Sequence, residues 1–125
     1  MQVVYLKTKS AVLLWDIEAL RRDVENLKFS VEVRRMLIVN IRGLYRLGNE
    51  DVMGADIGVF PIVASLSRDK YCVLSGGEQI EKAWRLGFKS IDCYYVKPAQ
   101  HKKYLLDYDE EIYLRAVKEY WEDEI

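Results

Sequence analysis

The chain has 125 residues, half of them hydrophobic, and its 19 Lys and Arg residues nearly balance 20 Asp and Glu residues for a formal net charge of -1. This length and apolar content predict one domain, residues 1–125, with a hydrophobic core of its own. The balanced charge excludes a strongly basic nucleic-acid binder and an acidic disordered chain, so any contact with DNA or RNA has to use a local patch.

The N-terminal part of the chain predicts a strand followed by a helix. Residues 3–6 form a short, mostly apolar run that is typical of a strand. Asp16 is a suitable N-cap residue, and apolar residues recur after it at helical spacing: Ile17, Leu20, Val24 and Leu27. We therefore expect one face of this helix to be buried.

The next segment, residues 31–47, fits two different structures. It can form one long helix, or strands that break near Gly43, because the apolar residues 37–39 suit both. We favour the helix. Asn49 then predicts the cap of a short helix that ends near Gly58.

The centre of the chain predicts a hairpin and a second helix. Apolar runs at 62–66 and 71–74 flank a polar turn, and Pro61 fits the start of the first strand or a sheet edge. A helix closed by Gly87 is expected after Gly76 and Gly77. Its core-facing residues are predicted to be Ile80, Ala83, Trp84 and Gly87, and its outward residues Glu78, Glu81, Lys82 and Arg85.

The C-terminal third is expected to add one strand and one helix. The strand is predicted at 91–96 and closed by Pro98, and the amphipathic helix at about 109–123. The apolar stripe of that helix comprises Ile112, Tyr113, Ala116, Val117, Tyr120 and Trp121. Mixed strands and helices with a hairpin predict the α+β class, with a small mixed sheet and packed helices.

The turn at Gly76 and Gly77 is a candidate phosphate site. Glycine lets the backbone approach a ligand, and the first N–H groups of a helix have no carbonyl partner within it. The alternative is a tight turn that needs positive φ. Glu78 is a candidate general base or Mg²⁺ ligand, or else a first-turn glutamate favoured by the helix dipole.

The order of elements at about 49–97 resembles the ParB/sulfiredoxin superfamily. A short loop leads into Pro61-Ile62-Val63, followed by a hairpin, the turn Gly77-Glu78-Gln79-Ile80 and a helix closed by Leu86-Gly87. ParB proteins usually carry Gly-Glu-Arg-Arg at this turn, and sulfiredoxins Gly-Cys-His-Arg. The resemblance implies a ParB-like core that binds ATP, ADP or CTP there, with Mg²⁺. Members of the superfamily include DNA clamps, phosphoryl-transfer enzymes and nucleases.

The chain departs from this family where the family carries cations. Gln79 can donate hydrogen bonds but cannot neutralise a phosphate, and Ile80 does neither. Glu78 takes the position of the sulfiredoxin nucleophilic cysteine, which excludes sulfinic-acid repair. Arg68, Lys70, Lys82 and Arg85 are candidate replacement cations, but we favour the alternative that they are solvated surface charges.

The most concentrated positive charge comprises Arg34, Arg35, Arg42 and Arg46. On the favoured helix at 31–47, Arg35, Arg42 and Arg46 share one face that can contact nucleic-acid phosphates. An ordinary solvated face is the alternative.

A histidine and several aromatic residues follow the last predicted strand. We expect His101 to be a surface loop residue, because no orienting carboxylate is spaced with it as an acid–base site requires. The aromatic residues can stack on bases, form a homodimer face or pack on the sheet, and packing explains most of them. They are Tyr104, Tyr108, Tyr113, Tyr120 and Trp121.

Targeting and cysteine patterns bear on where the protein resides. The N-terminus lacks the pattern of a signal peptide and no apolar run is long enough to span a membrane, so we expect a cytoplasmic protein with no membrane partner. Cys72 and Cys93 lack metal-ligand spacing, which favours buried free thiols. A disulfide between them stays open for a hyperthermophilic source.

These observations predict a ParB-like domain that binds nucleotide or nucleic-acid phosphate through Gly76, Gly77, Gln79 and Lys82. Metal-dependent phosphoryl transfer or nuclease activity, with Glu78 as base or metal ligand, is the catalytic hypothesis. The alternative is a non-enzymatic DNA-associated or protein-interaction module with a degenerate nucleotide site.

Overall fold

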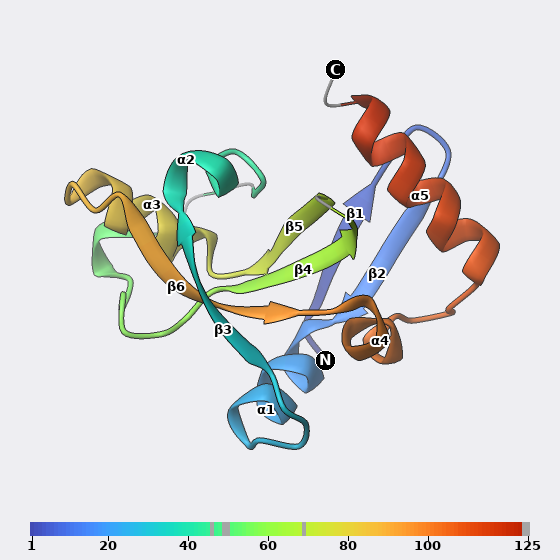
Figure 1. The fold of residues 1–125 in the computed structure, drawn as a ribbon, viewed down its shortest axis with the longest axis horizontal. Coiled ribbons are helices and arrows are strands. Elements are labelled where there is room, and N and C mark those ends of the chain that lie inside the picture. The colour runs from blue at the N-terminus through green and yellow to red at the C-terminus, as the bar shows by residue number, and fades with distance from the viewer. Residues whose placement is uncertain (46, 49–50, 69, 124–125) are drawn as a thin grey trace.

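The computed structural model describes residues 1–45, 47–48, 51–68 and 70–123, and it confirms the α+β class (Figure 1). Strands β1 (Val3–Lys7) and β2 (Val12–Asp16) form an antiparallel ribbon. A four-stranded sheet of order β3-β6-β4-β5 contains β3 (Glu32–Leu37), β4 (Ile62–Ser67), β5 (Lys70–Ser75) and β6 (Ser90–Val96). In this sheet β4 and β6 are parallel, and the pairs β3–β6 and β4–β5 are antiparallel.

Helices pack on both sheets. They are α1 (Ile17–Glu25), α2 (Ile38–Ile41), α3 (Gly77–Arg85), α4 (Pro98–His101) and α5 (Glu110–Asp123), with 3-10 turns η1 (Val52–Gly54) and η2 (Lys102–Tyr104). Figure 1 shows α2 and α3 together at one end of the four-stranded sheet and α5 beside the β1–β2 ribbon. No described helix is long and apolar enough to cross a membrane.

Two hydrophobic clusters lie on opposite faces of the four-stranded sheet. Ile62 and Ala64 of β4 belong to the cluster that includes the ribbon, α1 and α5, and Val63 belongs to the cluster beneath α2 and α3. Successive side chains of a strand point to opposite faces, so this central strand contributes to both clusters. The sheet is thereby covered on each side, and α3 is held against it by Ile80.

The predicted strand at 3–6 and the helix that Asp16 caps are confirmed. The Asp16 side chain accepts a hydrogen bond from the Ala19 N–H at 3.0 Å, which satisfies one free donor of the first turn. Ile17, Leu20 and Val24 are buried as expected. Leu27 is not: it lies beyond the end of α1 at φ +55° and is 80% exposed.

The favoured helix at 31–47 is wrong. Residues 32–37 form the edge strand β3, which pairs with β6 from Glu32 opposite Tyr95 to Leu37 opposite Ser90. Of the residues that the structure describes in this segment, only 38–41 are helical. Most of this edge strand is exposed on both faces, so its sequence lacks the alternation that identifies a half-buried strand. Arg35 and Arg42 therefore share no helix face, and Arg46 lies outside the described residues.

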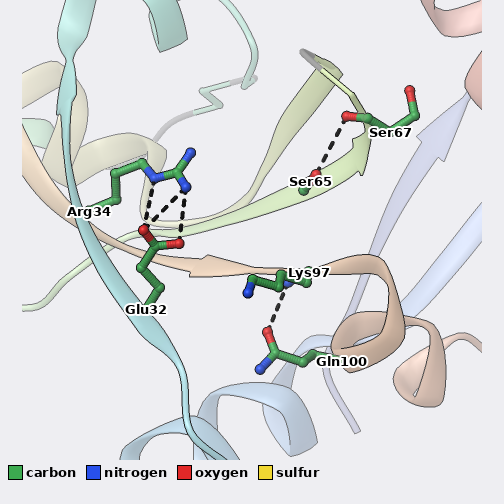
Figure 2. Close-up of polar contacts among 6 residues, drawn as sticks. All are labelled: Glu32, Arg34, Ser65, Ser67, Lys97 and Gln100. Atoms are coloured by element: carbon green, nitrogen blue, oxygen red, sulfur yellow. Dashed lines mark hydrogen bonds and ion pairs between the residues drawn. The ribbon is translucent and has the colours of Figure 1, made fainter.

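The hairpin, the C-terminal strand and the last helix are confirmed as β4–β5, β6 and α5. Pro61 immediately precedes β4, where its missing N–H interrupts no ladder. At the start of α4, the Lys97 N–H donates to Gln100 Oε1 at 2.9 Å (Figure 2). The predicted cap Asn49 lies outside the described residues, and the short helix after it is the single turn η1, capped by Asp51.

Packing explains Tyr104 and Tyr113 of the C-terminal segment, whereas Tyr108 is 46% exposed. The Tyr113 hydroxyl donates to the Leu66 carbonyl at 2.8 Å, and the Tyr104 hydroxyl donates to Asp23 Oδ2 at 2.7 Å. Tyr113, Ala116 and Val117 of the predicted stripe are buried, and Ile112 and Tyr120 are half-buried. The side chain of Trp121 lies outside the described part of the chain.

Both cysteines are buried free thiols, as predicted. Burial raises the pKa of Cys72 to about 12, so this thiol stays protonated at neutral pH. Cys93 is also raised to a pKa of about 12, by burial and then by the charge of Asp92. Neither group has the thiolate character of a reactive cysteine.

Candidate functional site

The strand-to-helix turn forms as predicted. Gly76 caps α3 at φ +92°, and its carbonyl accepts from the Ile80 N–H at 3.1 Å. The N–H groups of Gly77, Glu78 and Gln79 have no carbonyl partner within the helix, as at any helix start. At the other end, Gly87 at φ +89° closes the helix, but it is exposed rather than on the predicted core side.

Close packing accounts for both glycines of the turn. A Cβ at Gly76 would lie 2.6 Å from Pro61 Cα, and a Cβ at Gly77 would lie 2.8 Å from Cδ2 of Tyr45. Real Cβ atoms do not approach other heavy atoms this closely. The space beside Gly77 is therefore filled by an aromatic ring of the protein itself.

The other residues predicted around the phosphate have different surroundings. Gln79 is only 9% exposed and its Oε1 has no hydrogen-bond partner. Lys82 Nζ donates to the Ala55 carbonyl at 2.7 Å and holds η1 against α3. Glu78 is half-buried on the first turn. Among the described residues no group of three or more His, Cys, Asp and Glu side chains is placed to hold a metal ion.

The predicted outward position of Glu81 is wrong. This side chain is only 6% exposed, because the segment after α2 covers this face of α3. Arg42 Nε and Arg42 Nη2 each donate to Glu81 Oε1 at 3.2 Å. The second carboxylate oxygen, Oε2, is buried and has no partner.

Arg42 also contacts the outer side of α3. Its guanidinium carbon lies 4.9 Å from the centroid of the Trp84 ring, a cation–π contact. The Arg42 side chain is 47% exposed, so part of its guanidinium faces solvent. The structure thus places one predicted nucleic-acid arginine directly against the helix that follows the predicted phosphate turn.

These groups surround a depression of about 580 Å³, which we name the α3 hollow. It is lined by Val39, Arg42, Gly43, Tyr45, Leu47, Glu81 and Trp84. The Tyr45 ring lines the hollow and packs against Gly77. The Tyr45 hydroxyl is buried and has no hydrogen-bond partner. Burial and then the charge of Glu81 raise the pKa of Tyr45, while Arg42 and Arg85 oppose this shift.

The other two described arginines of the predicted patch, Arg34 and Arg35, lie on β3. Arg35 Nε donates to Asp92 Oδ1 at 3.1 Å, and the side chain is 74% exposed. Arg34 donates to both carboxylate oxygens of Glu32 (Figure 2) and stacks 3.7 Å from the centroid of the Tyr95 ring. Both side chains are exposed and paired with a carboxylate of the same sheet.

A second depression, of about 300 Å³, lies beside α1 and Ser75, the last residue of β5. Arg21 Nη2 donates to the Phe60 carbonyl and to Ser75 Oγ, each at 3.0 Å, and Arg21 Nη1 donates to Glu25. Because these bonds already engage the guanidinium, Arg21 primarily fixes the start of β4 to the end of β5. Sequence reasoning missed this contact, since the helix and the strands are far apart along the chain.

The predicted surface position of His101 is wrong. The ring is fully buried: Trp15 Nε1 donates to Nδ1 at 3.2 Å, and Nε2 lies 2.7 Å from the Ser65 carbonyl. These partners fit the neutral tautomer with the proton on Nε2. Burial lowers the pKa of His101 to about 4, so it is an uncharged core residue.

No protein-family model, curated protein or solved structure matches the chain. The α3 hollow is lined by the apolar residues Val39 and Leu47, by the aromatic residues Tyr45 and Trp84, and by Arg42, whose side chain is 47% exposed. Such a combination of apolar surface and a few convergent polar groups is typical of a small-molecule site. Sequence reasoning found Arg42 but missed Tyr45, Glu81 and Trp84 as members of one site.

Proposed function

We propose that this chain binds a nucleotide, or a nucleotide unit of a nucleic acid, in the α3 hollow beside the Gly76–Gly77 turn. The position of Arg42 is the observation that carries this proposal. Its guanidinium is held by Glu81 and Trp84 while 47% of the side chain stays exposed at the hollow. A guanidinium fixed in this way can bind phosphate oxygens with little further loss of side-chain freedom.

Arg42 and Arg85 supply the positive charge that Gln79 and Ile80 lack. Arg42 comes from the segment after α2 and Arg85 from the last turn of α3, and the charge of each is close enough to act on the Tyr45 hydroxyl. The ParB/sulfiredoxin-like core at 49–97 belongs to the same proposal. The order of hairpin, glycine turn, helix and strand, with β4 parallel to β6, supports it.

The proposal concerns binding. Glu78 lies on the first turn of α3 and is not among the residues that line the hollow. Metal-dependent phosphoryl transfer or phosphodiester hydrolysis through Glu78 is therefore a separate hypothesis. Loss of any such activity in Glu78→Gln, with nucleotide affinity unchanged, would support it.

The second candidate is a non-enzymatic DNA-associated or protein-interaction module. The close contacts of Gly76 with Pro61 and of Gly77 with Tyr45 favour it, because they explain the two glycines without a ligand. This candidate predicts no saturable binding of free nucleotides. Retention on DNA that weakens steeply with salt would distinguish DNA association from protein association.

Arg42→Ala is expected to weaken nucleotide binding by about tenfold or more, because a charge-assisted hydrogen bond is worth roughly 1.5 to 3 kcal/mol. The measurement is isothermal titration with ATP, ADP and CTP, each with Mg²⁺, supported by thermal shift. Arg35→Ala is the matched control, since Arg35 is also paired with a carboxylate but lies on β3.

Two results would contradict the proposal. If the wild-type protein bound no nucleotide at millimolar concentration, the proposed nucleotide site would be contradicted. An equal loss of affinity in Arg35→Ala and Arg42→Ala would show that binding depends on overall charge and not on the hollow.

A further inference from the structure

β3 forms one edge of the four-stranded sheet, and it is far more exposed than the strand at the opposite edge. Five of the six residues of β3 are exposed, whereas all six residues of β5 are buried or half-buried. α5 also contacts β5, where the Tyr120 hydroxyl donates to the Tyr71 carbonyl at 3.3 Å. An open edge presents backbone N–H and C=O groups to which another extended chain can bond. β3 is therefore the edge of this sheet to which a further strand can be added.

The hydrogen bonds between β3 and β6 indicate which backbone groups of β3 point outward. The Ile38 N–H donates to the Lys89 carbonyl at 2.9 Å, which continues the register of β3 on β6. Because bonded positions alternate along an antiparallel pair, the even-numbered residues of β3 bond to β6. The N–H and C=O groups of Val33, Arg35 and Leu37 therefore face away from the sheet. A strand that joins this edge has to bond to these residues.

The exposed side chains at the start of β3 form the order acidic, apolar, basic. Glu32 and Arg34 lie on one face of the strand, and Arg34 Nη2 donates to both carboxylate oxygens of Glu32, at 3.2 and 3.0 Å (Figure 2). Both side chains stay more than 40% exposed. Val33 lies between them on the other face and is 51% exposed. Such an order is complementary to itself when a second strand runs in the opposite direction.

From this arrangement we infer that β3 pairs with β3 of a second copy of this chain, antiparallel and centred on Val33. Two-fold symmetry places Val33 opposite itself, where two backbone hydrogen bonds join the strands. Glu32 of each copy then lies opposite Arg34 of the other, in a non-hydrogen-bonded pair, where side chains approach closely. The ion pairs within and between the strands form one network of four alternating charges.

This interface is separate from the α3 hollow, and the inference does not depend on nucleotide binding. It joins the two four-stranded sheets into one continuous sheet. Because each copy contributes its single β3 edge, the pairing closes at a dimer.

Charge distinguishes this register from its neighbours. Outward residues have to pair with outward residues, so each two-fold register is centred on one residue of the strand. The registers centred on Glu32, Arg34 or Arg35 place two identical charges opposite each other, which is unfavourable. Among the registers centred within β3, the one at Val33 places opposite charges of the strand against each other.

Charge reversal in mixtures tests this pairing directly. Glu32→Arg and Arg34→Glu each place like charges opposite one another in a self-paired dimer. Each variant alone is therefore expected to associate at least tenfold more weakly than the wild-type protein. An equimolar mixture of the two should associate again, because every acidic residue at the interface then lies opposite a basic one. The double variant Glu32→Arg/Arg34→Glu should also regain association.

The measurement is sedimentation equilibrium of the full chain in low salt, from about 10 µM to about 1 mM, the range in which small interfaces associate. The wild-type protein is expected to pass from monomer to dimer within this range. Arg115→Glu and Glu111→Arg on α5 are the matched controls, since both residues are exposed and lie on another element. Neither control should alter the association.

Val33→Pro tests the backbone part of the pairing. It removes an N–H that points outward, so the bonds from β3 to β6 remain, and proline is tolerated on an edge strand. We expect association to weaken at least tenfold. Val33→Thr keeps the N–H and should associate within a few-fold of the wild-type protein. Circular dichroism of each variant verifies that the fold is retained.

Three results would overturn the inference. The first is a wild-type protein that stays monomeric at about 1 mM. The second is association of Glu32→Arg alone that equals the wild-type value, because the charges would then not set the register. The third is a mixture of the two charge-reversal variants that associates no better than either variant alone.

Discussion

Gly76→Ala is expected to lower the free energy of unfolding by about 3 kcal/mol. Gly76 holds a left-handed conformation at φ +92°, which costs an L-residue roughly 1 to 2 kcal/mol. Its new Cβ would also lie 2.6 Å from Pro61 Cα, a backbone atom that cannot rotate away. Overpacking of this kind adds roughly 1 to 3 kcal/mol. Urea denaturation followed by circular dichroism measures the loss.

Gly87→Ala separates the two contributions. Gly87 has nearly the same conformation, φ +89°, but nothing lies within 4 Å of a Cβ built there. Gly87→Ala should therefore lower the free energy of unfolding only by the cost of a left-handed conformation, about 1 kcal/mol. Equal losses in the two variants would mean that the contact with Pro61 does not determine the need for glycine at 76.

The protein is expected to lose about 2 kcal/mol of stability between pH 7.5 and pH 5 through His101 alone. The pKa of His101 is about 4 in the folded protein, below its ordinary value of 6.5, because the ring is buried. As the pH falls through 6.5 the unfolded chain therefore binds a proton before the folded protein does. The stabilisation is complete above pH 6.5 and is lost progressively down to pH 4.

This effect can be assigned because His101 is the only histidine of the chain. Carboxylates titrate at lower pH, and hydrogen bonds from Ser10 and Thr8 lower the pKa of Glu119 to about 2. His101→Gln can keep both contacts, accepting from Trp15 and donating to the Ser65 carbonyl, and should flatten the dependence between pH 7.5 and 5. Urea unfolding at several pH values measures it, and an unchanged slope in the variant would contradict burial of a neutral His101.

Strong local signals in the sequence correctly predicted several elements. The Asp16 cap, the polar turn of the hairpin and the closure of α3 at Gly87 all depend on neighbouring residues and formed as expected. The glycine at 76 was also expected to need positive φ in one of the two interpretations of the turn. Local chemistry was sufficient in these cases because the partner groups are close in the chain.

The errors arose where distant segments decide the structure. β3 is an exposed edge strand that pairs with β6, some 60 residues later in the chain. No local pattern in the sequence predicts this pairing. His101 is buried by Trp15, which lies 86 residues away. Glu81 has the charge of a surface residue, and it is buried only because Arg42 and Tyr45 fold over α3.

Contacts between distant segments also decided how much of the candidate site was predicted. The turn and Arg42 were both identified as sites for phosphate, but the favoured helix at 31–47 kept them apart. Once residues 32–37 form a strand, the segment after α2 reaches α3 and the two sites become neighbours. The burial of Glu81 Oε2 and of the Tyr45 hydroxyl follows from that contact.

The central claim is that a nucleotide occupies the α3 hollow, and a ¹H–¹⁵N NMR titration with Mg²⁺-ATP or Mg²⁺-CTP tests it most directly. We expect saturable shifts that are largest at the backbone amides of Gly43 and Tyr45 and at the indole N–H of Trp84. Spectra that do not change at millimolar nucleotide, or changes centred on Arg35 and β3 with the Trp84 indole unaffected, would contradict it.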